Sequence, residues 1–143
     1  MKNTFLLLAI TFLLFGCNND KEKVIEMETE VLTLHDEVMP KLEEIMTLKS
    51  KLAKKIIGMD SLQNEGISGN NLAENRMKAV DLNLRLTESD KLMMDWMHAY
   101  NGDSAKKLKP KQSLLYFENE KKKMIQVKEF TLKTIQEANS YLN

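Results

Sequence analysis

Apolar positions in the first third of the chain repeat at helical spacing. Apolar residues between 24 and 38 recur at alternating steps of three and four, and the seam resumes over residues 42–56. This spacing predicts an amphipathic helix with one buried face. A second stripe lies beside the first and widens that face: Leu32, His35, Met39, Leu42 and Met46. Because Pro40 cannot donate a helical hydrogen bond, we expect a kink there, with the helix ending within residues 57–63.

Two further segments have helical periodicity and are separated by polar breaks. Residues 64–71 contain two glycines and three asparagines, a composition typical of a loop, and Asn71 is a candidate N-cap for the second helical segment. The pattern then predicts helices over residues 72–100 and 113–142, joined by a lysine-rich connection at 103–112. No segment alternates with the period of a strand. We therefore expect an all-α fold, an antiparallel, coiled-coil-like three-helix bundle in up-down-up order.

The beginning of the chain predicts export. Lys2 precedes an apolar run over residues 5–15, which has the length of a secretory h-region and is too short to span a membrane. Residues 14–17, Leu-Phe-Gly-Cys, resemble the bacterial lipobox, although phenylalanine is bulkier than usual at its position. This resemblance implies cleavage before Cys17 and acyl chains, palmitate among them, on its sulfur and amino group. The alternative is an uncleaved apolar anchor with an incidental thiol.

These expectations divide the chain into three parts. Residues 1–16 form a lipoprotein signal peptide, residues 17–23 a short lipidated tether, and residues 24–143 the helical bundle domain. The lysines of residues 106–111 lie in a connection, where they either contact membrane headgroups or keep the loop soluble.

Composition narrows the class of function. The chain has 43% apolar and 29% charged residues, which suits a compact helical domain. Its 21 basic and 21 acidic residues cancel, so no basic face for nucleic acid is expected. Cys17 is the one cysteine, which excludes a disulfide within the chain. Because phosphate-binding loops and metalloprotease or serine-nucleophile motifs are also absent from the sequence, we expect no catalysis.

Two histidines and ten methionines supply candidate metal ligands. His35 and Met39 share one helical face, as do Met94 and His98. If the first two predicted helices pack antiparallel about the loop, His35 faces His98 and Met39 faces Met94. Imidazole and thioether groups suit Cu(I), and a His/Met pair also binds haem iron in some cytochromes. The alternative is that these methionines fill gaps in the core and the histidines lie at its edge.

Two short motifs predict modification. Residues 60–62, Asp-Ser-Leu, and residues 103–105, Asp-Ser-Ala, resemble the Asp-Ser/Thr-apolar acceptor of a bacterial O-glycosylation system. The resemblance implies glycans on Ser61 and Ser104. Asp-Ser is also an ordinary turn pair, so a purely structural role stays open.

Two segments carry a resemblance to a known group of proteins. Residues 35–41, His-Asp-Glu-Val-Met-Pro-Lys, and residues 93–97, Met-Met-Asp-Trp-Met, are similar to segments of short bacterial lipoproteins often labelled viral A-type inclusion protein repeat. The resemblance implies a lipid anchor and a helical fold, and it supplies no catalytic residue.

The sequence thus predicts a non-enzymatic module of the cell envelope, held at the outer membrane by lipid on Cys17. We expect it to present a helical surface to an envelope protein or to a second copy of itself, without a cofactor. The alternative is a periplasmic copper or haem binder that uses His35, Met39, Met94 and His98.

Overall fold

The computed structural model describes residues 16–67 and 69–143, with side chains described for all of these except residues 16–19 and 70. Apart from Gly16, the predicted signal peptide lies outside the described residues. Within them the chain forms helices and turns and no strand, which confirms the prediction of an all-helical fold.

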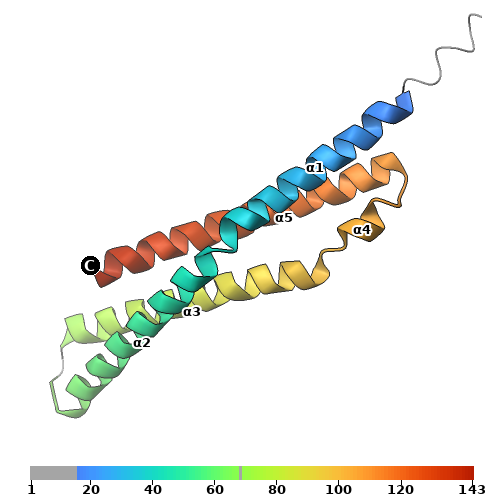
Figure 1. Ribbon diagram of the computed structural model, residues 1–143. Coiled ribbons are helices and arrows are strands. Elements are labelled where there is room, and N and C mark those ends of the chain that lie inside the picture. The colour runs from blue at the N-terminus through green and yellow to red at the C-terminus, as the bar shows by residue number, and fades with distance from the viewer. Residues whose placement is uncertain (1–15, 68) are drawn as a thin grey trace, which may run out of the picture.

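Four long helices and one short one make up the described chain (Figure 1). They are α1 (Gly16–Val38), α2 (Lys41–Asn64), α3 (Asn70–Ala99), α4 (Gly102–Ala105) and α5 (Pro110–Leu142). The bounds of α3 and α5 agree with the predicted second and third helices to within three residues. The sequence pattern did not indicate α4, because four residues are too few to show a helical period.

The predicted bend at Pro40 is present. It separates α1 from α2, and the Met39 N–H still donates to the His35 carbonyl at 2.9 Å while the Leu42 N–H donates to the Met39 carbonyl at 3.2 Å. Pro40 keeps helical backbone angles, with φ −64° and ψ −19°. The chain therefore changes direction within a single turn and resumes the helix at once.

Two local predictions were wrong. Residues 17–23, expected to be a tether, belong to α1, since lysine and glutamate favour the helix and continue it into Val24. Asn71 does not cap α3, because the helix starts earlier: Gly69 is the N-cap, and its carbonyl accepts from the N–H groups of Leu72 and Ala73 at 3.0 and 3.2 Å.

Two ion pairs fix the register of α1 on α5. Lys121 Nζ lies 2.6 Å from Glu30 Oε2, and Lys128 pairs with Glu37. Both pairs join residues 91 positions apart, so α1 and α5 run parallel with residue i of α1 level with residue i+91 of α5. The two helices lie side by side along the length of α1 (Figure 1).

Helix α3 runs antiparallel to α2 and to α5. Arg76 of α3 pairs with Asp60 near the end of α2, whereas Asn83 Nδ2 donates to the Lys49 carbonyl, a residue earlier in α2, at 3.1 Å. On the other side Tyr141 Oη, at the end of α5, donates to the carbonyl of Asn75 at the start of α3, at 2.8 Å.

The core has two parts that follow this pairing. The part between α1, the end of α3, α4 and the start of α5 buries Val24, Val31, Val38, Met93, Trp96, Ala105, Phe117, Met124 and Val127. The part between α2, the start of α3 and the end of α5 buries Ile45, Leu48, Leu52, Met59, Ala79, Leu82, Leu86, Ile135 and Ala138. The apolar seam predicted for the first helical stretch is therefore buried, and α5 contributes to both parts.

Candidate functional site

Trp96 is the centre of a row of aromatic side chains that crosses the first part of the core. It is 6% exposed, and its ring stacks on Tyr100 with centroids 4.8 Å apart. On the α1 side the His35 ring lies 5.5 Å from it. The row continues through Tyr116, 6.3 Å from Tyr100, to Phe117, 5.3 Å further and edge-on. The row thus joins α1, α3 and α5 at one level of the molecule.

Two hollows open on either side of Trp96. The larger, which we call the Trp96 groove, has a volume of about 440 Å³ and lies between α3 and α5. It is lined by Leu92, Asp95, Trp96, Ala99, Lys123, Gln126, Val127 and Phe130. The smaller has a volume of about 220 Å³, lies between α1 and α3, and is lined by Leu32, His35, Trp96, Met97 and Tyr100.

The chemistry of the Trp96 groove suits an apolar group with a polar edge. Its walls are aliphatic and aromatic. Its polar lining is the amide of Gln126 together with Asp95, which pairs with Lys91 at 2.6 Å, and Lys123, which pairs with Glu120 at 2.7 Å. Its volume falls within the range of ligand pockets, and Trp96 is the type of residue that dominates binding energy at interfaces. The groove is thus able to accept an apolar side chain or chain segment and to pair with one charge beside it.

A buried phenol lies next to the aromatic row. Tyr100 Oη is buried without a hydrogen-bond partner in the described residues, and Glu28, which Lys106 neutralises at 2.9 Å, lies close by. Burial raises the pKa of Tyr100 to about 12, and the negative charge of Glu28 adds to the effect. A Cβ on Gly102 would lie 2.6 Å from Tyr100 Oη, so a side chain at that position would displace the phenol.

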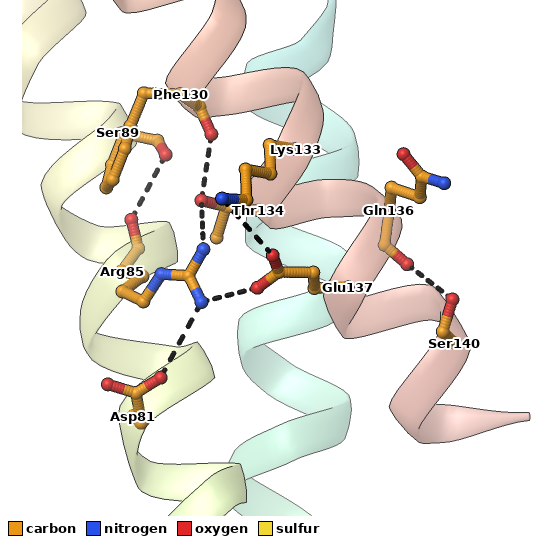
Figure 2. A network of polar contacts seen from close by, with 9 residues as sticks. All are labelled: Asp81, Arg85, Ser89, Phe130, Lys133, Thr134, Gln136, Glu137 and Ser140. Carbon is orange, nitrogen blue, oxygen red and sulfur yellow. Dashed lines mark hydrogen bonds and ion pairs between the residues drawn. The ribbon is translucent and has the colours of Figure 1, made fainter.

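A polar network holds the middle of α3 to the last third of α5 (Figure 2). Arg85 Nη1 donates to Glu137 Oε2 at 2.5 Å and lies 3.7 Å from Asp81, and Nη2 lies 3.5 Å from Thr134 Oγ1. Hydrogen bonding to Arg85 lowers the pKa of Glu137, and the same bond raises the pKa of Arg85. Because its charges are matched, this network is best understood as a cross-link between two helices.

The four predicted metal ligands occupy different surroundings. His35 is half-buried against Trp96 with Nδ1 2.9 Å from Asp36 Oδ1, and Met39 packs against the first part of the core. Met94 and His98 are both exposed.

The antiparallel packing assumed for that metal site is present in part: the His35 ring lies 5.5 Å from Trp96, two residues before His98, while α1 packs mainly along α5. The contacts described for His35 and Met39 join them to core residues. A copper or haem site stays a prediction, which competition for Cu(I) against a chelator and haem titration would test.

The predicted modification sites lie in accessible helices. Ser61 is exposed in the last turn of α2, where its Oγ donates to the Ile57 carbonyl at 3.1 Å. Ser104 is exposed in α4, and its N–H donates to Asn101 Oδ1 at 3.3 Å. Cys17 is the second residue of α1. Glycosylation and lipidation of these residues stay predictions.

Sequence reasoning missed the Trp96 groove. The sequence drew attention to Trp96 through the resemblance of residues 93–97 to segments of short bacterial lipoproteins. A usable signal was present, since Leu92, Trp96 and Ala99 share one face of α3 at steps of four and three. The facing wall, with Val127 and Phe130, could not be assigned because it depends on how α5 packs on α3.

Comparison of the chain with protein-family models, curated proteins and solved structures found no match. Within residues 16–67 and 69–143, no helix has the length and apolar character needed to cross a membrane. The site is therefore interpreted from its own residues.

Proposed function

We propose that the protein is a lipid-anchored, non-catalytic interaction module of the bacterial cell envelope, attached at the outer membrane through Cys17. The lipobox-like residues 14–17 and the resemblance to short bacterial lipoproteins support the anchor. In this proposal the helices form one up-down-up bundle, in which α1 and α2 together are the first member. The parallel register of α1 on α5 and the antiparallel contacts of α3 support that arrangement.

The Trp96 groove is the observation that carries the proposed interaction. An aromatic residue that borders an open, mostly apolar hollow is typical of a surface that binds a partner. A helix of an envelope protein, or of a second copy of this chain, would insert an apolar side chain beside Trp96. A basic residue on that helix would join the ion pair of Asp95 with Lys91, or an acidic one would join that of Lys123 with Glu120. Nucleic acid is not the expected partner, since the net charge is zero.

Site-specific photo-crosslinking in native envelopes tests the groove. A photoreactive residue at Gln126, which is exposed in the groove lining, should give one discrete adduct. The matched control carries the same residue at Lys51, exposed on α2, and should give no such adduct. Ala99→Phe, which fills the groove, should remove the Gln126 adduct while leaving the amount of protein unchanged. Equal adducts from both positions, or an adduct that survives Ala99→Phe, would refute the proposed site.

A further inference from the structure

A cluster of lysines lies at one end of the molecule. Residues 106–111, which we call the lysine loop, read Lys-Lys-Leu-Lys-Pro-Lys and comprise the connection from α4 to α5 and the first two residues of α5. Lys107, Lys109 and Lys111 are exposed, and Leu108 between them is 48% exposed. A loop that exposes a leucine among lysines combines positive charge with an apolar tip.

The charge of the lysine loop is only partly neutralised. Lys106 pairs with Glu28 at 2.9 Å and with Asp103 at 3.1 Å. In the part of the chain that the structure describes, the other three lysines make no ion pair. Within residues 20–23, at the start of α1, acidic and basic residues alternate and cancel. This end of the molecule therefore keeps a net positive charge.

The register of α1 on α5 places the loop beside the predicted anchor. Since residue i of α1 is level with residue i+91 of α5, Pro110 at the start of α5 is level with position 19, two residues after Cys17. Figure 1 shows the same arrangement: the first turns of α1 and the α4–α5 connection lie at one end of the molecule, and the α2–α3 turn lies at the other. A lipid on Cys17 would hold the lysine loop next to the membrane surface.

We propose that the lysine loop is a second membrane contact, in which Lys107, Lys109 and Lys111 bind the phosphate groups of anionic lipids and Leu108 lies at the headgroup boundary. The proposal rests on the lipid anchor of the proposed function. Acyl chains combined with a basic patch are the kind of two-part signal that gives stable membrane attachment. The lipid and the lysine loop, two contacts at one end, would hold the elongated molecule upright on the membrane. A lipid alone would leave the tilt of the molecule free.

Upright attachment has a consequence for the Trp96 groove. The groove lies near the level of His35, which is 18 residues along α1 from Cys17, or about 27 Å at 1.5 Å per residue. The upright molecule would then present the Trp96 groove well outside the headgroup layer, where a second protein has access to it.

Spin labelling of the lipidated protein tests this contact. In that protein the sulfur of Cys17 carries lipid, so a single introduced cysteine takes the label. A label at Leu108→Cys reports the loop, and one at Leu62→Cys, 40% exposed near the far end of α2, is the control. In phosphatidylcholine vesicles containing phosphatidylglycerol, the label at 108 should lose access to a water-soluble nickel chelate and gain access to oxygen. The label at 62 should stay open to the chelate.

Removing the charges distinguishes the contribution of the lysines to membrane contact from that of Leu108. Lys107, Lys109 and Lys111 changed together to glutamine should restore chelate access at position 108. The same change at Lys49, Lys51 and Lys54 on α2 removes equal charge and should have no effect. High salt, or vesicles of phosphatidylcholine alone, should act like the first variant.

Three results would overturn the inference. A lipidated protein whose label at 108 stays as open to the chelate as the label at 62 contradicts the loop contact alone. Protection that persists without phosphatidylglycerol contradicts recognition of anionic headgroups. If the intact mass of the protein purified from its envelope shows no lipid, both the proposed lipid anchor and the proposed loop contact are refuted.

Discussion

Ile45 and Met46 are neighbours in α2 with opposite surroundings. Ile45 is completely buried between α2, α3 and α5, whereas Met46 is 69% exposed. Ile45→Ala should lower the free energy of unfolding by about 2–5 kcal/mol, because it removes buried methyl groups and leaves a cavity. Met46→Ala should change it by less than about 0.5 kcal/mol. Urea unfolding of the two variants checks this, and equal costs would show that the α2 face is assigned wrongly.

Tyr100 gives a prediction about alkaline pH. Its pKa is about 12 in the folded protein and about 10 in an unfolded chain, so the folded state binds the proton more tightly. The resulting stabilisation is complete below pH 10 and is lost as the pH rises towards 12. Tyr100→Phe removes this contribution. Melting temperatures measured across that range should fall more steeply for the wild type, and parallel curves would contradict the buried phenol.

The buried face of α1 and α2 could be predicted from the spacing of apolar residues, because every position on that face is apolar. The buried face of α3 could not be predicted in this way, because it includes Ser89, and a polar residue is not assigned to the core from apolar periodicity. Ser89 is fully buried, with its Oγ donating to the Arg85 carbonyl at 3.1 Å. In α5, Glu120 lies in the buried stripe and pairs with Lys123 at 2.7 Å. Local partners of this kind do not show in a hydropathy pattern.

At the scale of elements, the end of α2 depends on a glycine. Gly66 has φ +82°, and the Ile67 N–H beyond it donates to the Leu62 carbonyl at 3.0 Å, which closes the helix. Gly66→Ala should destabilise the protein by about 1–2 kcal/mol, since a Cβ disfavours this conformation.

Gly58 supplies the matched control for Gly66. It lies within α2, and a Cβ there meets nothing within 4 Å, so Gly58→Ala should stabilise the protein by about 0.5–1 kcal/mol. Thermal or urea unfolding should therefore give shifts of opposite sign for the two alanine variants. Shifts of the same sign would contradict the assigned end of α2.

The link between α3 and α5 predicts coupling between Arg85 and Glu137. A double-mutant cycle with Arg85→Gln and Glu137→Gln should give a coupling energy of about 0.5–1 kcal/mol, small because both side chains are partly exposed. Since the pKa of Glu137 is lowered in the folded state, this contribution is present above its unfolded pKa and disappears as the pH falls through the folded value. A coupling that persists at a pH where Glu137 is protonated would contradict the ion pair.

The presence of the long helices and the bend at Pro40 could be predicted from the sequence. Which helices pack against one another could not. Periodicity shows which face of a helix is buried and leaves open which helix covers it. The bend directs α2 onto α3, while α1 packs along α5. His35 lies beside Trp96, two residues before its predicted partner His98, whereas the position of α5 along α1 could not be predicted.

In the whole molecule, the proposed lipid anchor and the Trp96 groove lie at different levels. α5 contributes to both parts of the core and, at 33 residues, is about 50 Å long. One end of the molecule would hold lipid and lysines, and the middle presents the Trp96 groove. The proposed function depends on this separation, because a binding surface held against the headgroups would be closed to a protein partner.

The intact mass of the protein purified from its own envelope shows whether Cys17 carries lipid. We expect the mass of residues 17–143 plus a diacylglyceryl group and, where the amino group is acylated, one further acyl chain. Glycans on Ser61 or Ser104 would add sugar masses that a glycosidase removes. The mass of the unmodified 143-residue chain, or of a cleaved chain without lipid, would refute the lipid anchor at Cys17.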